Sequence, residues 1–274
     1  MTNIEMTLDD IKNVSLDIMK HFHSVCQDNN INYSLGYGSL IGAVRHNGFI
    51  PWDDDLDVIM LREDFEKFCS IYKDSGKYKL FAPQRNNMFA ACARLCEMES
   101  TYVKTASPLF TEPTGLWIDI FPIDSAADNK DGIEQFYRKR KNMVALYKKI
   151  MMRRSSMICW DDNEHDFLSF LKFVAKKTLF HQDINKLVKK YCKLCVSFAK
   201  PDSEFVCNLS ILTYKELYPR SLFKSYKLSS FEDTEFMIVS EYDSLLKSIY
   251  GNYLQLPPVE KRIREHNVHK YYWK

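Results

Sequence analysis

The stretch GSLIGAVRHNGFIPWDDDLDV, from Gly38 to Val58, decides the predicted fold of this 274-residue chain. It ends in a cluster of four acids, three of which, Asp53, Asp55 and Asp57, recur at every second residue. Successive side chains of an extended backbone point to opposite faces, so these three share one face and Asp54 points to the other. Like charges packed together repel each other, and a hard cation such as Mg²⁺ (or Mn²⁺) offsets that cost because it binds oxygen ligands. We therefore predict a metal site here.

The residues around the last two acids favour a strand over a solvated turn, which is the alternative for an acidic run. Apolar residues alternate with these acids and follow them between Leu56 and Met60, which is strand composition. A carboxylate on an otherwise buried strand needs a compensating partner. Asp55 and Asp57 are therefore the predicted metal ligands. Asp53 reaches the metal directly or through water, or contacts only the substrate.

A short strand, a turn and a helix precede the acids. Residues 32–37 carry little charge and predict the strand, and residues 39–46 suit a helix. Gly38 and Ser39 would aim backbone N–H groups at one point, where the partial positive charge of the helix N-terminus favours a phosphate. We predict that Ser39 caps the helix and contacts a phosphate oxygen.

A Gly-Ser pair at a helix start, followed by Asp-x-Asp on the next strand, resembles the nucleotidyltransferase superfamily. The full strings YGSLIGAVRH (37–46) and GFIPWDDDLD (48–57) are similar to the signature of the LicD family. That family comprises bacterial phosphocholine transferases and is related to the fukutin-type ribitol-phosphate transferases. The string GLWIDIFPID (115–124) and a looser one at 245–262 extend the resemblance over most of the chain.

Asp119 is the candidate third carboxylate. It alternates with Trp117 and Phe121 on an apolar strand, where an acid is out of place unless the strand is an edge that faces water. The LicD resemblance implies a metal-binding acid at this position, which would complete a site with Asp55 and Asp57. Beside a second metal ion, Asp119 would also accept the proton of an attacking hydroxyl.

The resemblance implies a transfer reaction that suits such a site. The donor would be a CDP-linked alcohol, with CDP-choline as the prototype, and CMP would leave. Phosphocholine or a related phosphoalcohol would pass to a hydroxyl of a cell-surface glycan, lipopolysaccharide or teichoic acid precursor, free or lipid-linked. The alternative is a nucleotidyltransferase that adds a nucleotide to a small molecule or protein and releases pyrophosphate. A non-catalytic scaffold is disfavoured, because it has no reason to keep mutually repelling carboxylates.

Two arginines are candidate substrate contacts. Arg45 lies in the first string, and its planar guanidinium suits bidentate binding of phosphate. The alternative for Arg45 is a surface salt bridge with an acid such as Asp54. Arg94 lies in an apolar stretch and would face the nucleotide, or else pair with Glu97 or Glu99.

Aromatic residues in the matching strings are candidates for binding choline, whose quaternary ammonium favours aromatic faces. Trp52 and Trp117 are assigned to the substrate here, although core packing is the favoured role for each. Near the C-terminus, Arg262, Arg264 and His266 contact phosphate in one interpretation and form a solvated tail in the other.

Composition describes a soluble globular protein, with 46% apolar and 27% charged residues. A net charge of +2 does not suggest a nucleic-acid partner. The first ten residues lack the basic start and apolar run of a secretory signal, and no apolar run is long enough to span a membrane. The eight cysteines lie mostly in apolar stretches, which favours buried, reduced thiols over a disulfide framework or a zinc site. We therefore expect a cytoplasmic protein.

Patterning predicts an α/β (α+β) chain with three parts. Residues 1–125 form an α/β core in which Thr7 opens the first helix through a capping box. The resemblance implies that this core is a nucleotidyltransferase-like catalytic unit, a mixed sheet with flanking helices. Residues 126–215 form a helical subdomain, and residues 216–274 form a C-terminal hairpin and helix that return to the core. Three amphipathic helices are expected at 131–154, 164–177 and 183–200, a hairpin at 221–239, and a last helix that Ser240 caps and Gly251 ends. The remaining predictions are a helix at 62–73 and strands at 55–61, 78–81, 89–96 and 116–121.

The densest basic stretch is the helix at 133–154. Its basic residues lie on one side and its apolar residues on the other. An ordinary amphipathic helix packed on the core, with a solvated basic side, is the favoured interpretation. The sharper hypothesis is peripheral contact with anionic lipid, which would place the protein at the inner face of the cell membrane.

Overall fold

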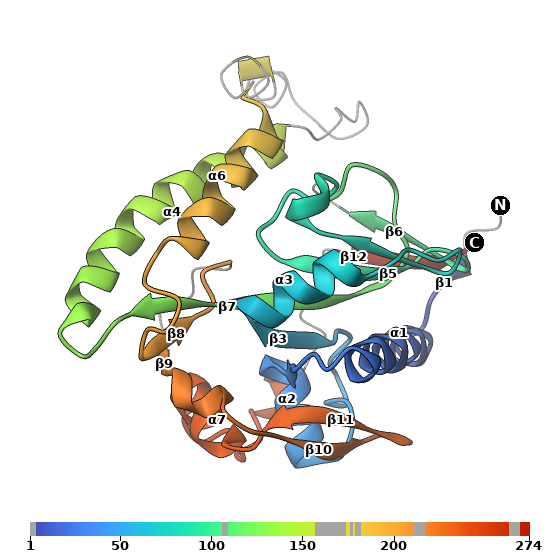
Figure 1. The fold of residues 1–274 in the computed structure, drawn as a ribbon. Coiled ribbons are helices and arrows are strands. Elements are labelled where there is room, and N and C mark those ends of the chain that lie inside the picture. Colours follow the sequence, from blue (N-terminus) through green and yellow to red (C-terminus); the bar gives the residue numbers. More distant parts are fainter. Residues whose placement is uncertain are drawn as a thin grey trace.

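A mixed sheet lies at the centre of the molecule (Figure 1), as a computed structural model shows for residues 4–105, 109–156, 174–175, 178, 182–210, 217–262 and 269–274. Its strands follow the order β2-β3-β7-β5-β4, and β8 and β9 extend it along the second half of β7. Strands β3 and β7 run parallel, and the other pairs are antiparallel. The predicted α/β class with a mixed sheet is therefore confirmed. The strands are β2 (Ser34–Leu35), β3 (Asp57–Leu61), β4 (Tyr78–Phe81), β5 (Ala93–Glu97), β7 (Trp117–Ala127), β8 (Phe205–Cys207) and β9 (Leu217–Pro219).

Helices α1 (Leu8–Asp28) and α3 (Arg62–Ile71) cover one face of this sheet. Helix α1 begins with the predicted capping box, in which the Asp10 N–H donates to Thr7 and the Thr7 N–H donates to Asp10. The two helices meet through Phe22 and Phe68, whose ring centroids are 4.9 Å apart. Both rings are fully buried, so the apolar sides of the helices close the main core.

Helix α2 (Tyr37–His46) lies between β3 and the C-terminal part of the chain. It packs against α7 (Tyr242–Tyr250) and against the hairpin of β10 (Tyr226–Phe231) and β11 (Thr234–Val239). The hairpin is shorter than predicted, because residues 220–223 form a 3₁₀ turn. Glu241, not Ser240, is the N-cap of α7, because the Ser240 N–H still donates to Ser225 across the hairpin. Gly251, with φ = 68°, ends α7 as predicted.

Helices α4 (Gly132–Ser156) and α6 (Ile184–Val196) lie side by side, away from the main core (Figure 1). Their apolar sides form a second buried cluster with the end of β7. Two basic residues expected on the solvated side are buried: Arg140 is 3% exposed and Arg154 is 9% exposed. The predicted helix at 164–177 lies mostly outside the described residues.

A second sheet joins β1 (Ile4–Glu5), β12 (His269–Trp273) and β6 (Thr101–Thr105) in antiparallel order. None of these strands was predicted, because each is short and its partners are distant in sequence. Two further 3₁₀ turns are η1 (Pro83–Arg85) and η3 (Val259–Lys261). Within the described ranges, no helix is both long and apolar enough to cross a bilayer.

Candidate active site

Strands β3 and β7 bring two of the predicted acids together. Because the strands are parallel, Asp57 at the start of β3 lies opposite Asp119 on β7. Asp53, Asp55 and Asp57 are half-buried and line one cleft, whereas Asp54 is 2% exposed and does not. The predicted alternation of these side chains is therefore confirmed, although β3 begins at Asp57 and Asp55 precedes it.

Crowding of carboxylates dominates the electrostatics of this site. Burial raises the pKa of Asp57 well above its usual range, and the negative charges of Asp55, Asp119 and Asp53 raise it further. Arg94 opposes this shift but does not cancel it. Asp57 therefore lies in a local excess of negative charge, where a cation would be stabilised.

Asp119 is held by two donors rather than left open. The Arg94 Nε donates to its Oδ1 at 2.5 Å, and the Trp117 Nε1 donates to its Oδ2 at 3.3 Å. The pairing follows from sheet register, since Arg94 on β5 lies opposite Asp119. Burial alone would lower the pKa of Arg94, but the charge of Asp119 raises it above its usual value. The Arg94 Nη1 is buried and has no hydrogen-bond partner among the described residues.

Arg94 was expected either to face the nucleotide or to pair with Glu97 or Glu99, and the structure shows neither. Arg94 does not line the cleft, and its ionic partner is Asp119. The Glu97 carboxylate instead accepts backbone N–H groups of the turn that follows β5. The Arg94 guanidinium lies 4.6 Å from the ring centroid of Trp117.

The carboxylates supply the hard oxygen donors that Mg²⁺ prefers, and the negative charge around Asp57 is only partly compensated by Arg94. Over the described part of the chain, however, no three His, Cys, Asp or Glu side chains are arranged as ligands of one metal ion. Asp55 and Asp57 open to the cleft and fit the role of ligands. Asp119 would have to exchange a contact with Arg94 or Trp117 to join them, so the three-residue metal set stays a prediction.

Ser39 does not cap helix α2. The helix begins at Tyr37, with Gly36 as its N-cap, so Ser39 falls inside the first turn and is 4% exposed. Its Oγ accepts the N–H of Asp57 at 2.8 Å, which ties the helix to the start of β3. Ser39 therefore positions the acid rather than the helix end.

At Gly38 the acidic stretch approaches the first turn of helix α2 closely. A Cβ at this position would lie 2.7 Å from the Asp53 Oδ2, closer than real Cβ contacts allow. The missing side chain lets the Asp53 carboxylate pack against the first turn of α2. The turn and the acidic stretch are thus parts of one site.

The cleft beside the acids has a volume of about 600 Å³, which is in the range of sites for small-molecule ligands. One wall comes from α2 and the acidic stretch, and the other from the segment that follows α7. The two segments that form these walls are nearly 200 residues apart in sequence and line the same cleft. The lining residues are Tyr37, Gly38, Ile41, Arg45, Ile50, Trp52, Asp53, Asp55, Asp57, Tyr250, Asn252, Tyr253, Gln255, Leu256, Pro257 and Pro258.

Two guanidinium groups lie near this cleft. The Arg45 Nη1 donates to the Tyr253 carbonyl at 2.6 Å, and its Nε donates to the His46 Nε2 at 2.9 Å. The Arg262 Nε donates to the Pro257 carbonyl at 2.9 Å. Burial and the nearby charge of Arg262 lower the pKa of Arg45, as expected for two neighbouring cations.

Neither guanidinium is neutralised by a carboxylate in the regions that the structure describes. The alternative salt bridge between Arg45 and Asp54 is therefore absent, because the Arg45 fork is turned toward Tyr253. An acidic wall and an uncompensated basic region thus meet at one cleft. This arrangement suits a ligand that carries phosphates and binds a cation.

Comparison with known proteins agrees with the geometry. Residues 30–151 match the family described as LicD/FKTN/FKRP, nucleotidyltransferase domain. This part of the chain therefore matches the LicD family. The whole chain is similar to the lipopolysaccharide cholinephosphotransferase LicD of Haemophilus influenzae, with 26% identity over 279 aligned residues and 98% of each chain covered.

Two shorter matches involve uncharacterized proteins of Rickettsia. The protein from Rickettsia typhi is 38% identical over 82 residues, which is 29% of this chain and 25% of that protein. The one from Rickettsia prowazekii is 51% identical over 47 residues, which is 17% of this chain and 18% of that protein. The predicted LicD resemblance is confirmed by the family match and by the full-length relative. Both cover more of the chain than these two short matches do.

The two tryptophans of the LicD strings lie in different surroundings. Trp52 lines the cleft, where its ring centroid is 5.6 Å from the Arg262 guanidinium. Trp117 is 6% exposed and packs in the core against Phe110 and Tyr271. Trp117 therefore has the core-packing role that the sequence favoured.

Three tyrosines of the cleft were not assigned from sequence, and Arg262 was named only in one of two interpretations. Tyr37, Tyr250 and Tyr253 line the cleft, and Arg262 lies over Trp52. The looser string at 245–262 was the available signal, since three of these residues lie within it. Arg264 and His266 lie outside the described residues.

Proposed function

We propose that this chain transfers phosphocholine, or a related phosphoalcohol, from a CDP-linked donor to a hydroxyl of a cell-surface glycan or its lipid-linked precursor, releasing CMP. The full-length similarity to a lipopolysaccharide cholinephosphotransferase supports the reaction class. The single observation that carries the proposal is the cleft between Asp55 and Asp57 on one wall and Arg45 near the other. A diphosphate that binds a divalent cation matches both charges.

The chain's own residues divide the work in this proposal. Arg45 and Arg262 bind oxygens of the donor diphosphate, because each guanidinium keeps N–H groups beyond those donated to backbone carbonyls. Asp55 and Asp57 would hold Mg²⁺ or Mn²⁺, which would neutralise charge on the phosphoryl oxygens when bound. Asp119 is the acid we assign to the proton of the attacking hydroxyl, and Arg94 and Trp117 fix its carboxylate.

The aromatic residues of the cleft offer a place for a quaternary ammonium. One face of Trp52 already lies near the cationic Arg262, which would repel a second cation. Tyr37, Tyr250 and Tyr253 line the same cleft as the acids and are the better candidates for contacting choline.

Incubation of the protein with a panel of CDP-alcohols, Mg²⁺ and candidate glycan acceptors tests this function. We expect CMP release with one of these donors, measured by anion-exchange chromatography, and its loss in Asp57→Asn. Pyrophosphate release from a nucleoside triphosphate, without CMP release from any CDP-alcohol, would instead establish a nucleotidyltransferase. That second candidate is kept because the matched family is described by its nucleotidyltransferase domain. Calorimetry that detects no binding of CDP-choline with Mg²⁺ would favour a scaffold.

A further inference from the structure

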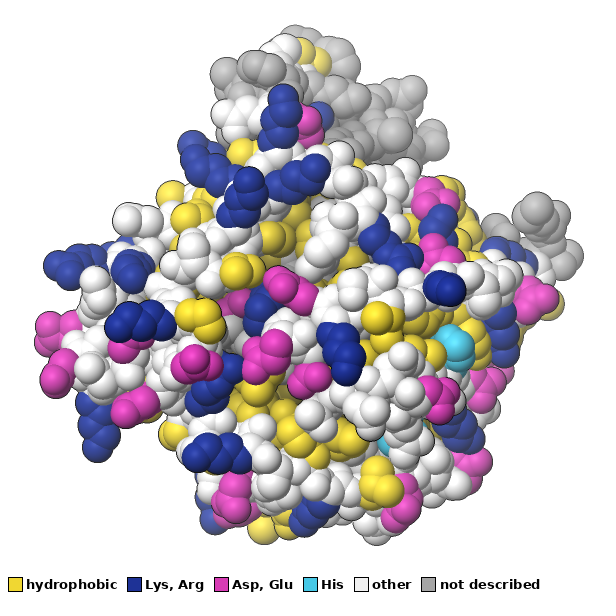
Figure 2. All heavy atoms as spheres, in the orientation of Figure 1, with side chains coloured by type: hydrophobic (Ala, Val, Ile, Leu, Met, Phe, Trp, Pro, Cys, Tyr) yellow, Lys and Arg dark blue, Asp and Glu magenta, His cyan; other side chains and the backbone are white. Residues whose placement is uncertain are grey.

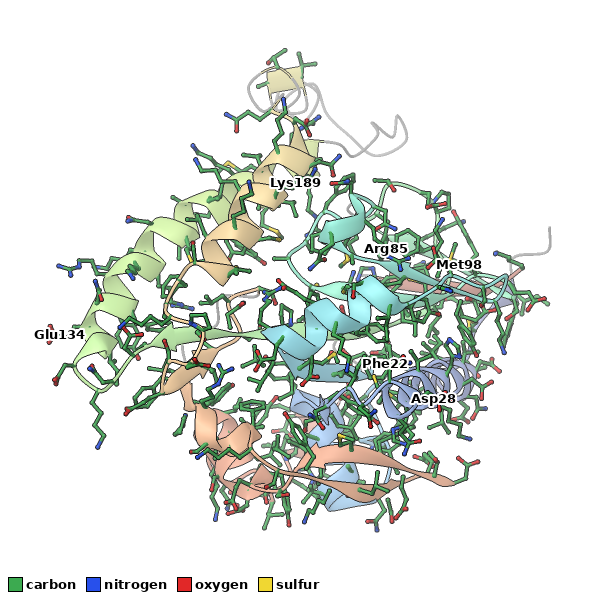
Figure 3. All side chains as sticks on the ribbon, in the orientation of Figure 1. Phe22, Asp28, Arg85, Met98, Glu134 and Lys189 are labelled. Carbon is green, nitrogen blue, oxygen red and sulfur yellow. The ribbon has the colours of Figure 1, made fainter. Side chains whose placement is uncertain are left out.

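Helices α4 and α6 present an exposed basic surface that the proposed reaction does not use. In Figure 2, Lys and Arg side chains gather over the region where Figure 1 draws these helices. Glu134 stands in the first turn of α4, and Lys189 belongs to α6 (Figure 3). We call the following exposed side chains the α4–α6 basic surface: Arg138, Lys141, Lys148, Lys149, Lys186, Lys189, Lys190 and Lys193.

Charge is strongly segregated along this nearly neutral chain. Residues 135–200 hold 16 of the 38 basic residues but only 5 of the 36 acidic ones, which gives this segment a net charge of +11. The rest of the chain holds the other 22 basic and 31 acidic residues and carries −9. After Glu134, neither α4 nor α6 contains an acid. The molecule therefore has a large electric dipole despite its net charge of +2.

Apolar side chains stand among these cations. Tyr137 is 46% exposed and Met152 is 40% exposed on α4, and on α6 Val196 is 50% exposed. Tyr137, Lys141, Lys148 and Met152 are spaced by four, seven and four residues, so they share one side of α4. The opposite side of each helix fills the second buried cluster. Lysines interspersed with exposed apolar side chains are typical of helices that lie in a membrane interface.

We propose that the α4–α6 basic surface binds an anionic lipid bilayer. The lysines contact lipid phosphates, and the exposed apolar side chains enter the headgroup region. The negative remainder of the chain turns away from the bilayer, which gives the bound protein one orientation. A nucleic acid is the less favoured partner, because seven of the eight cations are lysines and exposed apolar groups on the same surface add nothing to phosphate binding. The benefit of docking rests on the proposed function, because a lipid-linked acceptor would then be delivered at the membrane.

Vesicle co-sedimentation of the full chain tests this proposal without any substrate. We expect binding to vesicles of phosphatidylcholine with phosphatidylglycerol, release by high salt, and little binding to phosphatidylcholine alone. The variant Lys141→Glu, Lys148→Glu, Lys190→Glu should lower the partition coefficient at least about 100-fold, since each basic residue near an anionic surface contributes about five-fold.

The matched control carries the same charge change at exposed lysines elsewhere: Lys73→Glu, Lys224→Glu, Lys270→Glu. It should bind nearly as well as the wild type. Equal loss in both variants, wild-type binding by the first, or binding to single-stranded RNA but not to anionic vesicles would overturn the proposal. Asp57→Asn should keep vesicle binding. Vesicle binding and CMP release therefore test the docking proposal and the proposed reaction independently.

Discussion

Strand β7 carries two buried aspartates with arginine partners, and they differ in how completely they are paired. At Asp124, the Arg62 Nε and Nη2 donate to both carboxylate oxygens, at 2.7 and 2.9 Å. At Asp119, Arg94 donates only from Nε, and its buried Nη1 is left without a hydrogen-bond partner within the described ranges. The two acids are five residues apart, so they point to opposite faces of the strand.

Their surroundings differ as well. Asp119 lies beside Asp57, whose pKa is raised by burial and by three neighbouring acids. For Asp124, burial raises the pKa and the pairing with Arg62 opposes that shift. A saturated pair behind the sheet is a structural unit, whereas an incompletely satisfied pair next to crowded carboxylates has remaining capacity for a ligand.

The largest effect should follow substitution on the cleft side. Asp57→Asn should lower CMP release by about 100-fold or more, as loss of one preorganised electrostatic group does in other active sites. The free energy of unfolding should stay the same or rise, because repulsion among the acids is relieved. Steady-state assays and urea denaturation measure the two quantities.

Asp55→Asn should behave in the same way, because it shares the cleft. If either variant kept near-normal turnover, the assignment of the acids would be refuted. Asp28→Asn on the exposed end of α1 is a control that should change neither quantity.

Substitution behind the sheet should show the reverse pattern. Asp124→Asn leaves the Arg62 charge buried without its partner, so we expect a loss of about 3 kcal/mol in unfolding free energy. The folded fraction should release CMP at the wild-type rate. Urea denaturation and assays below the unfolding transition measure both.

The double variant Arg62→Met, Asp124→Asn should regain part of that stability, because removing both charges avoids an unpaired ion. A large loss of turnover in fully folded Asp124→Asn would contradict the contrast between the two pairs.

Local pattern was enough to predict one part of this site. Alternation placed Asp53, Asp55 and Asp57 on one side and Asp54 on the other, which the structure confirms. Strand β4 was predicted with its observed bounds, and β7 was predicted near its start, because apolar alternation in a buried strand is a strong signal.

The missed features depend on contacts between distant segments. Arg94 and Asp119 pair because β5 lies antiparallel on β7 in one register, which no local pattern specifies. Ser39 was expected at the helix N-cap, but α2 starts at Tyr37, whose φ of 46° is rare for a residue other than glycine. The far wall of the cleft comes from residues 250–258, which carry no strong secondary-structure pattern.

The basic side of the cleft offers a further contrast between two neighbouring cations. Arg262→Gln should raise the KM for the CDP-alcohol about 10- to 100-fold, the usual value of a lost hydrogen bond to a charged group. Lys261→Gln is the matched control, because Lys261 is exposed, whereas Arg262 is half-buried and lies over the cleft residue Trp52. An unchanged KM in Arg262→Gln, or an equal rise in both variants, would remove Arg262 from the donor site.

The smallest effect should be a pH dependence of stability that only the cleft side produces. The raised pKa of Asp57 means that the folded chain binds a proton that the unfolded chain has already released. Between the usual aspartate pKa of about 3.9 and the raised pKa of Asp57, unfolding free energy should therefore fall as pH rises. Urea denaturation across this window, with a chelator present, should give a flatter profile for Asp57→Asn than for the wild type. Identical profiles would mean that the neighbouring carboxylates do not hold a proton on Asp57, and the electrostatic contrast between the two sides of β7 would be lost.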